Sequence, residues 1–173
     1  MQLPQGFAEI STFVFDMDGV LTDGTVWVLE DRRMIRRMSI KDGFALQLAI
    51  KKGFHIAVIS GSTSPEVTER LKGLGITDVF MGVKQKEECL QAFLKTKNIP
   101  LHQVLYMGDD IPDLGVMKRV GLACAPADAV SEIKEIATYI SAYTGGNGCV
   151  RDVIEKVLKL HNAWDLDTDI ASR

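Results

Sequence analysis

Short apolar segments rich in β-branched and aromatic residues alternate with segments of helical periodicity along the chain. Apolar runs of this length, bounded by polar residues or glycine, are typical of buried strands. Strands are therefore expected at 12–15, 55–60, 78–81, 104–107, 122–125 and 139–141. Between them, the pattern predicts helices from Asp42, as the capping residue, to Gly53, and at 65–72, 86–97, 112–120, 129–136 and 150–160.

This alternation indicates an α/β fold in which a parallel sheet is covered by helices on both faces, a Rossmann-like arrangement of three layers. One segment departs from it, because the apolar runs 25–29 and 34–40 flank the polar turn 30–33 and read as a hairpin. We expect one domain over 1–162, with a hairpin flap at about 24–40. Residues 163–173 are expected to form a frayed acidic tail.

The composition narrows the function without revealing it. The 173 residues are 46% hydrophobic and 25% charged, which is ordinary for a globular protein and argues against a disordered chain. A net charge of -3 argues against binding to nucleic acid. Three scattered cysteines form neither a disulfide framework nor a zinc motif. The sequence shows no signal peptide and no apolar run long enough to span a membrane, so we expect a cytoplasmic location.

Chemically active side chains follow the predicted strands. In a parallel sheet, ligands bind beyond the carboxyl ends of the strands. Carboxylates gathered there repel one another, and a bound divalent cation removes the conflict. Mg²⁺ fits best, because it prefers carboxylate oxygens together with water and phosphate. The residues concerned are Asp16, Asp18, Ser60, Lys86, Asp109, Asp110 and Asp113.

The motifs around these residues carry a resemblance. They read F-D-M-D-G-V-L-T-D-G at 15–24, V-I-S-G-S at 58–62, a lysine that opens a helix, and M-G-D-D-I-P-D at 107–113. In this order they resemble the phosphatases of the haloacid dehalogenase superfamily, over most of the chain. The segments between the motifs are too short to bury a core of their own, so no cap domain is expected.

The resemblance implies roles for individual residues. Asp16 is expected to attack phosphorus and form an aspartyl-phosphate. Asp18 is expected to serve as general acid and then as general base. Ser60 and Lys86 are expected to bind and neutralise the phosphoryl group.

The same resemblance implies a magnesium site. Asp16, Asp109 and the backbone carbonyl of Asp18 are its expected ligands. Asp110 or Asp113 is expected to hold a metal-bound water or the lysine. Lys84 is the second candidate for that lysine, since it also lies next to the start of the helix.

Other segments resemble one subgroup without a cap, the 3-deoxy-D-manno-octulosonate 8-phosphate phosphatases. These segments are D-G-V-L-T-D-G, I-K-D-G-F at 40–44 and G-G-N-G-C-V-R at 145–151. The subgroup implies a sugar acid phosphate substrate of lipopolysaccharide biosynthesis. It also implies a homotetramer in which the hairpins meet at the centre and neighbouring subunits share sites.

Substrate contacts are expected from Gly61, Ser62, Arg70 and Lys84, with possible help from the hairpin residues Arg32, Arg33, Arg36 and Arg37. Relatives that act on octulosonates commonly have arginine where this chain has Ser62, and those that act on nonulosonates have glutamate. Because serine carries no charge, a nine-carbon substrate stays an alternative to the eight-carbon one.

Two readings from other classes compete with a phosphatase. A phospho-accepting receiver domain also combines carboxylates, a hydroxyl and a lysine on a parallel sheet. Its acceptor aspartate follows the third strand and its lysine comes last, whereas here Asp109 and Asp110 follow Lys86. A non-catalytic regulatory domain is the other reading, and it conflicts with the presence of a suitable residue at every expected catalytic position.

Overall fold

The computed structural model describes residues 6–165, 167, 169 and 170. Residues 1–5 of the predicted domain, and 166, 168 and 171–173 of the predicted tail, lie outside the described residues. Among the described helices, none is long and apolar enough to cross a membrane.

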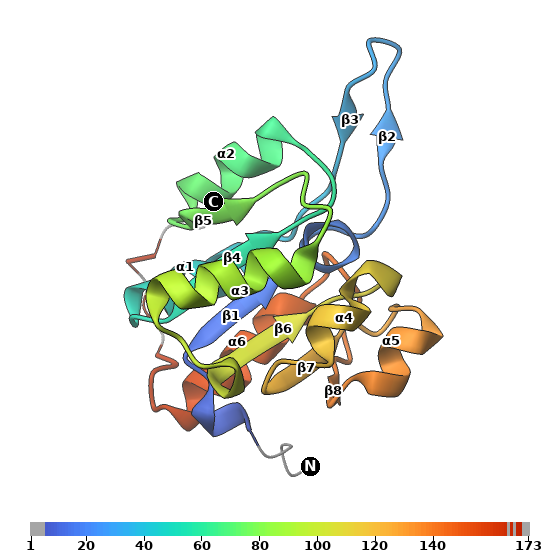
Figure 1. Ribbon diagram of the computed structural model, residues 1–173. Coiled ribbons are helices and arrows are strands. Elements are labelled where there is room, and N and C mark those ends of the chain that lie inside the picture. The colour runs from blue at the N-terminus through green and yellow to red at the C-terminus, as the bar shows by residue number, and fades with distance from the viewer. Residues whose placement is uncertain (1–5, 166, 168, 171–173) are drawn as a thin grey trace.

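Six parallel strands form the central sheet, in the order β5-β4-β1-β6-β7-β8 (Figure 1). The structure confirms all six predicted strands to within a residue or two. Their bounds are β1 Thr12–Phe15, β4 His55–Ile59, β5 Asp78–Phe80, β6 Val104–Met107, β7 Leu122–Ala125 and β8 Tyr139–Ile140. The chain fills one side of β1 with β4 and β5 before it crosses to the other side with β6, so the strand order reverses between β1 and β6.

Alternation along each strand divides the core between the two faces of the sheet. In β1, Phe13 and Phe15 join the cluster on one face, and Val14 joins the cluster on the other. Helices α1, α2 and α6 cover the first face, and α3, α4 and α5 cover the second (Figure 1). The expected three-layer α/β fold is confirmed. The helices are α1 Ile40–Lys51, α2 Pro65–Gly73, α3 Lys86–Lys97, α4 Leu114–Met117, α5 Ser131–Ile136 and α6 Cys149–Leu160.

Two helix predictions need correction. The helix expected at 112–120 is a 3-10 turn at Ile111–Asp113 followed by the short α4, which contains Gly115, a poor helix former. The cap of α1 is Ser39, whose hydroxyl accepts from Asp42 N at 3.3 Å.

Asp42 has another part in the fold. Its buried carboxylate accepts from the backbone N–H of Arg151 at 2.8 Å and of Gly148 at 3.3 Å, at the start of α6. It therefore caps a helix more than a hundred residues away in the sequence, which a local pattern cannot reveal.

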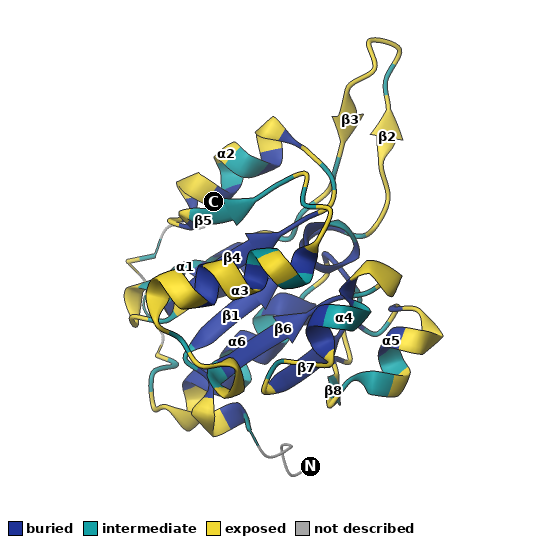
Figure 2. Ribbon diagram, in the orientation of Figure 1, coloured by how far each residue is buried: buried dark blue, intermediate teal, exposed yellow. Residues whose placement is uncertain are grey.

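The hairpin projects away from the body of the domain (Figure 1). Its strands β2 Trp27–Val28 and β3 Met34–Ile35 are shorter than predicted, and an isolated bridge joins Thr22 to Met38 at its base. All four strand residues are exposed (Figure 2). Because no core lies against it, the hairpin lacks the packing that would extend its ladder.

The described residues of the tail contact the domain, so the expectation of a frayed tail is wrong for them. Trp164 lies edge-on to Phe44, and the Arg151 guanidinium stacks over the Trp164 ring. Lys52 and Lys51 form ion pairs with Asp165 and Asp167 at 2.5 and 2.6 Å. Aromatic packing and ion pairs therefore hold these tail residues against the domain.

Candidate active site

The predicted site residues converge because three neighbouring strands end beside one another. β1 lies between β4 and β6, so Asp16, Ser60 and Asp109 follow adjacent strands at the reversal point of the sheet. Here they line a cavity of about 300 Å³, which we call the aspartate cavity. Its lining residues are Asp16, Asp18, Gly24, Ser60, Gly61, Ser62, Lys86, Asp109, Asp110 and Pro112.

Asp16 is held by its own turn and by a lysine. Its Oδ1 accepts from the N–H of Met17 at 2.6 Å, and its Oδ2 lies 2.9 Å from Lys86 Nζ. Burial and the neighbouring Asp113 raise the pKa of Asp16 to about 6, although Lys86 opposes the shift. The site thus presents one carboxylate oxygen fixed by the backbone and another fixed by a cation.

Lys86 is the lysine of the site. Its Nζ also donates to Asp113 Oδ1 at 2.8 Å, and both side chains are almost fully buried. Asp113 further accepts from the Tyr106 hydroxyl at 2.6 Å and from Asp109 N at 3.2 Å. Asp113, and not Asp110, therefore holds the lysine. Asp110 accepts from Ile111 N at 2.7 Å and starts the following turn.

Two glycines permit this close packing. A Cβ on Gly19 would lie 2.0 Å from Asp109 Oδ2, and the residue also has φ +82°, which favours glycine. A Cβ on Gly108 would lie 2.4 Å from the Asp113 side chain. The glycines of the first and last motifs thus allow the carboxylates to approach one another.

The carboxylates fit a divalent cation. Oxygens of Asp16, Asp109 and Asp113 lie within 4.8 Å of one another. The buried Asp109 Oδ1 has no hydrogen-bond partner. Burial, then Asp16, Asp113 and Asp110, raise the pKa of Asp109 to about 7. Because Asp113 already accepts three donors, Asp16 and Asp109 are the carboxylates left to bind a metal.

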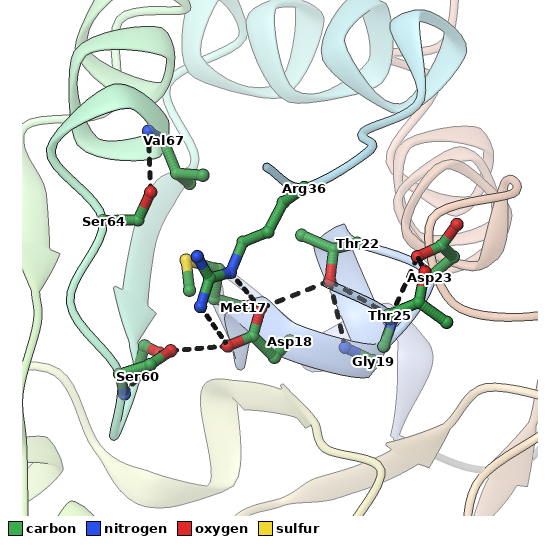
Figure 3. Close-up of polar contacts among 12 residues, drawn as sticks. Met17, Asp18, Gly19, Thr22, Asp23, Thr25, Arg36, Ser60, Ser64 and Val67 are labelled. Atoms are coloured by element: carbon green, nitrogen blue, oxygen red, sulfur yellow. Dashed lines mark hydrogen bonds and ion pairs between the residues drawn. The ribbon is translucent and has the colours of Figure 1, made fainter. Parts of the chain in front are cut away.

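Asp18 is surrounded by donors (Figure 3). Arg36 Nε donates to its Oδ1 at 2.7 Å, and Arg36 Nη2 donates to its Oδ2 at 3.3 Å. Ser62 Oγ donates to the same Oδ2 at 2.5 Å, and Thr22 Oγ1 donates to Oδ1 at 3.4 Å. The hydroxyl oxygen of Ser60 lies 3.2 Å from that of Ser62. Ser62 thus contacts Asp18 directly in the aspartate cavity.

The other two predicted substrate contacts lie elsewhere. Lys84 is exposed and lines a neighbouring groove with Glu87 and Glu88. Lys86 and Pro112 line both this groove and the aspartate cavity, whereas Lys84 does not line the aspartate cavity. Arg70 lines a second cavity of about 380 Å³ between the hairpin and α2, which we call the arginine cavity. Its lining residues are Arg33, Met34, Ile35, Arg36, Met38, Ile40, Ser64, Glu66, Val67 and Arg70.

Sequence reasoning missed two residues of the network. Arg36 was one of four hairpin arginines with nothing to distinguish it, and only the path of the chain brings it to Asp18. Tyr106 lies within a strand, where an aromatic residue is ordinary core material. The contact between the Tyr106 hydroxyl and Asp113 shows that Tyr106 belongs to the network, and the sequence gives no sign of that contact.

This fold and site define a class, the haloacid dehalogenase-like hydrolases, and residues 72–153 match that family. The chain is 32% identical over 156 residues to the 3-deoxy-D-manno-octulosonate 8-phosphate phosphatase KdsC of Escherichia coli (strain K12). That match covers 90% of this chain and 83% of the relative. The chain therefore belongs to the haloacid dehalogenase-like hydrolases, and the expected superfamily and enzyme class, a phosphatase, are confirmed. The receiver-domain alternative is wrong.

Solved structures agree with this membership. The 3-deoxy-D-manno-octulosonate 8-phosphate phosphatase of Yersinia pestis matches with a TM-score of 0.90 at 31% identity, over 92% of this chain and 86% of that one. The Moraxella catarrhalis enzyme of the same name matches with a TM-score of 0.88 at 33% identity, over 91% of each chain. The latter structure contains a magnesium ion, a phosphate ion and a KDO molecule.

Proposed function

We propose that this chain is a magnesium-dependent phosphatase of 2-keto-3-deoxy sugar acid phosphates, with 3-deoxy-D-manno-octulosonate 8-phosphate as its substrate. One observation carries the reaction type. Asp16, Asp18, Ser60, Lys86 and Asp109, from different parts of the chain, line or border one cavity at the sheet edge. The substrate class is supported by similarity to phosphatases of that name.

In the proposed first step, an Asp16 oxygen attacks phosphorus while the bond from phosphorus to the sugar oxygen breaks. Asp18 gives its proton to that leaving oxygen, so the alcohol departs neutral. Lys86 and the Ser60 hydroxyl hold the phosphoryl oxygens, whose charge grows in the transition state. The products of this step are an acyl phosphate on Asp16, the aspartyl-phosphate, and the free sugar acid.

In the second step, water attacks phosphorus and gives a proton to Asp18, and the bond to Asp16 breaks. Inorganic phosphate leaves and both aspartates return to their starting states. Asp113 and Tyr106 keep Lys86 directed at Asp16 through both steps. Asp16, Asp109 and the backbone carbonyl of Asp18 would hold Mg²⁺, which would supply positive charge to offset the phosphate and the carboxylates.

A homotetramer is part of the proposal. Trp27, Val28, Met34 and Ile35 are exposed on the hairpin, and Trp27 is 73% exposed. Clustered exposed apolar side chains mark interaction surfaces. A second copy of the chain packed on the hairpin would bury them and could also close the arginine cavity, which borders the hairpin.

A comparison of kcat/KM among phosphate substrates tests the proposal. With Mg²⁺ present, we expect the highest kcat/KM for the eight-carbon acid phosphate, then the nine-carbon one, and much lower values for hexose phosphates and p-nitrophenyl phosphate. A nine-carbon compound in first place would select the alternative. A hexose phosphate in first place would contradict the substrate class and leave the phosphatase chemistry intact.

A further inference from the structure

We infer that Arg36 selects substrates that carry a carboxylate, by leaving the Asp18 carboxylate for that of the substrate. The inference rests on the proposed function for the identity of the substrate, and on the structure for the choice of residue. The sequence offered four hairpin arginines as equals, whereas the structure separates one of them from the rest.

Arg36 differs from its neighbours in burial and in partner. Its side chain is 5% exposed, whereas those of Arg33 and Arg37 are 69% and 65% exposed. Arg33 pairs with Asp31 and Arg37 with Asp23, both near the surface of the hairpin and its base. Only the guanidinium of Arg36, among these three, reaches a residue of the aspartate cavity. A buried guanidinium without a charged partner is strongly destabilising, so the ion pair with Asp18 fixes the position of the Arg36 side chain.

Arg36 also lies at the border between the two cavities. Asp18 lines the aspartate cavity, and Arg36 lines the arginine cavity, so their ion pair separates the two spaces. Figure 3 shows the Arg36 side chain entering from the segment before α1 and meeting Asp18 on the side away from Gly19. The arginine cavity carries three arginines against one acidic residue, Glu66. A sugar whose phosphate occupies the aspartate cavity can extend its other end toward this basic space.

The present ion pair conflicts with the proposed role of Asp18. Each of its oxygens accepts from Arg36, and Ser62 and Thr22 add one donor each. An oxygen engaged in this way cannot approach the leaving oxygen of a substrate. Arg36 must therefore release Asp18 before the reaction, and its guanidinium then needs another partner.

A substrate carboxylate meets that need with little loss. It presents two coplanar oxygens to the guanidinium, as Asp18 does, so one bidentate pair replaces another. A neutral substrate offers no such exchange and leaves a buried guanidinium without a charge partner. Release of Asp18 is thus coupled to the negative charge of the substrate, which yields selectivity for sugar acids over neutral sugars.

The matched test uses two substrates that differ in one charge. One is the eight-carbon acid phosphate, and the other is the same compound with its carboxylate converted to the neutral carboxamide. We expect the wild-type kcat/KM to favour the acid by at least about tenfold. In Arg36→Met the preference falls to near unity, because the acid slows while the amide stays within about twofold or speeds up.

Two further variants control the result. Arg36→Lys keeps the positive charge but loses the paired N–H donors of the guanidinium, so this variant should retain part of the preference for the acid. Arg32→Met removes an exposed arginine at the turn of the same hairpin and keeps the full preference. Thermal unfolding of each variant is measured alongside, so that loss of folded protein is separated from loss of selectivity.

The outcomes distinguish the inference from the proposed function. Equal losses for acid and amide in Arg36→Met would overturn the inference, because they describe a residue that only positions Asp18. So would a wild-type enzyme indifferent to the charge. If neither octulosonate compound is cleaved, the proposed substrate is wrong, and 6-phosphogluconate against sorbitol 6-phosphate tests Arg36 by the same criterion. A protein that cleaves no phosphomonoester overturns both.

Discussion

The sheet edge and the hairpin are stabilised in opposite ways. At the sheet edge, charged groups such as Lys86 and Asp113 are buried and satisfied by one another inside a complete core. On the hairpin, apolar groups such as Trp27 and Ile35 face solvent on strands of two residues each. The first region holds the residues of the proposed chemistry inside the core, whereas the second presents an apolar surface to solvent.

The ion pair of Arg36 and Asp18 joins the two regions. The position of the hairpin therefore bears directly on the proposed acid and base. A flap that is held by neighbouring subunits, as we propose, would also keep the Arg36 side chain at the border between the two cavities. The domain would thus combine a self-contained reaction centre with a specificity element that depends on assembly.

The largest effect is expected at the centre of the sheet edge. Asp16→Asn should lower kcat by at least about a thousandfold, because an amide is a poor nucleophile toward phosphorus. Steady-state assays with Mg²⁺ measure the loss, and circular dichroism confirms the fold. Asp31→Asn, at an exposed position of the hairpin turn that lines neither cavity, is the control and should keep most of the activity. Full activity in Asp16→Asn would end the aspartyl-phosphate mechanism.

Lys86 tests whether the buried charges depend on one another. Lys86→Met leaves Asp16 and Asp113 buried without their cation, so we expect a loss of about 3 to 5 kcal/mol in the free energy of unfolding without metal. We also expect kcat to fall by about a hundredfold or more, since phosphoryl charge loses its partner.

Lys84→Met is the matched control, because Lys84 is exposed and lies two residues away. The free energy of unfolding in urea and the steady-state kcat of Lys84→Met should both be close to those of the wild type. Similar losses in both variants would show that the network around Lys86 does not have the importance that its geometry indicates.

The sheet edge was largely predictable from sequence for a geometric reason. Parallel strands place their carboxyl ends at one edge, so residues such as Asp16 and Asp109, 93 positions apart by their numbers, can be joined without knowledge of side chains. The strands themselves were clear, because buried parallel strands read as short continuous apolar runs.

What the sequence could not determine depends on side-chain direction and on remote contacts. Lys84 and Lys86 lie close to the same helix start, so the sequence could rank Lys86 first but kept Lys84 as a candidate. The structure separates them, because Lys86 is buried against Asp16 and Asp113 and Lys84 is exposed. Asp42 looked like a local cap, yet its acceptors serve α6. The hairpin strands were predicted too long because apolar runs favour strands, whereas the structure leaves the strand residues 27, 28, 34 and 35 exposed to solvent.

Substitutions on the apolar surface of the hairpin should change the oligomeric state of the protein but not the stability of the folded chain. Trp27 and Ile35 are directly paired across the hairpin, so Trp27→Ser with Ile35→Ser removes the centre of its apolar surface. Light scattering should show a fall from a tetramer to smaller species. The free energy of unfolding of the isolated chain should change by less than about 1 kcal/mol, because both side chains are exposed.

Leu160→Ser provides a control for this effect, since Leu160 is an exposed apolar residue outside the hairpin. It should leave the assembly unchanged. A wild-type protein that is already monomeric at micromolar concentration would refute the role given to the hairpin surface.

The smallest effect is expected in the dependence of stability on pH without metal. Asp16 and Asp109 have pKa values of about 6 and about 7 in the folded protein, above the 3.8 of an ordinary aspartate. The folded state therefore binds more protons than the unfolded state between about pH 4 and pH 7, so these groups make stability fall as the pH rises. Their contribution is complete below pH 4 and absent above about pH 7.

Asp109→Asn isolates the contribution of Asp109 to the pH dependence of stability, because the amide does not titrate and the other titrating groups are present in both proteins. Between about pH 5 and pH 7, the metal-free wild type should lose a few degrees of Tm relative to Asp109→Asn. Adding Mg²⁺ near pH 7.5 should raise the Tm of the wild type more than that of the variant, because the cation binds the charged carboxylates of the folded state. Parallel Tm curves for the two proteins, with and without Mg²⁺, would mean that Asp109 neither carries the raised pKa nor binds the metal. The crowding of carboxylates at the sheet edge would then have no measurable cost, and the main physical reason to place a cation there would be lost.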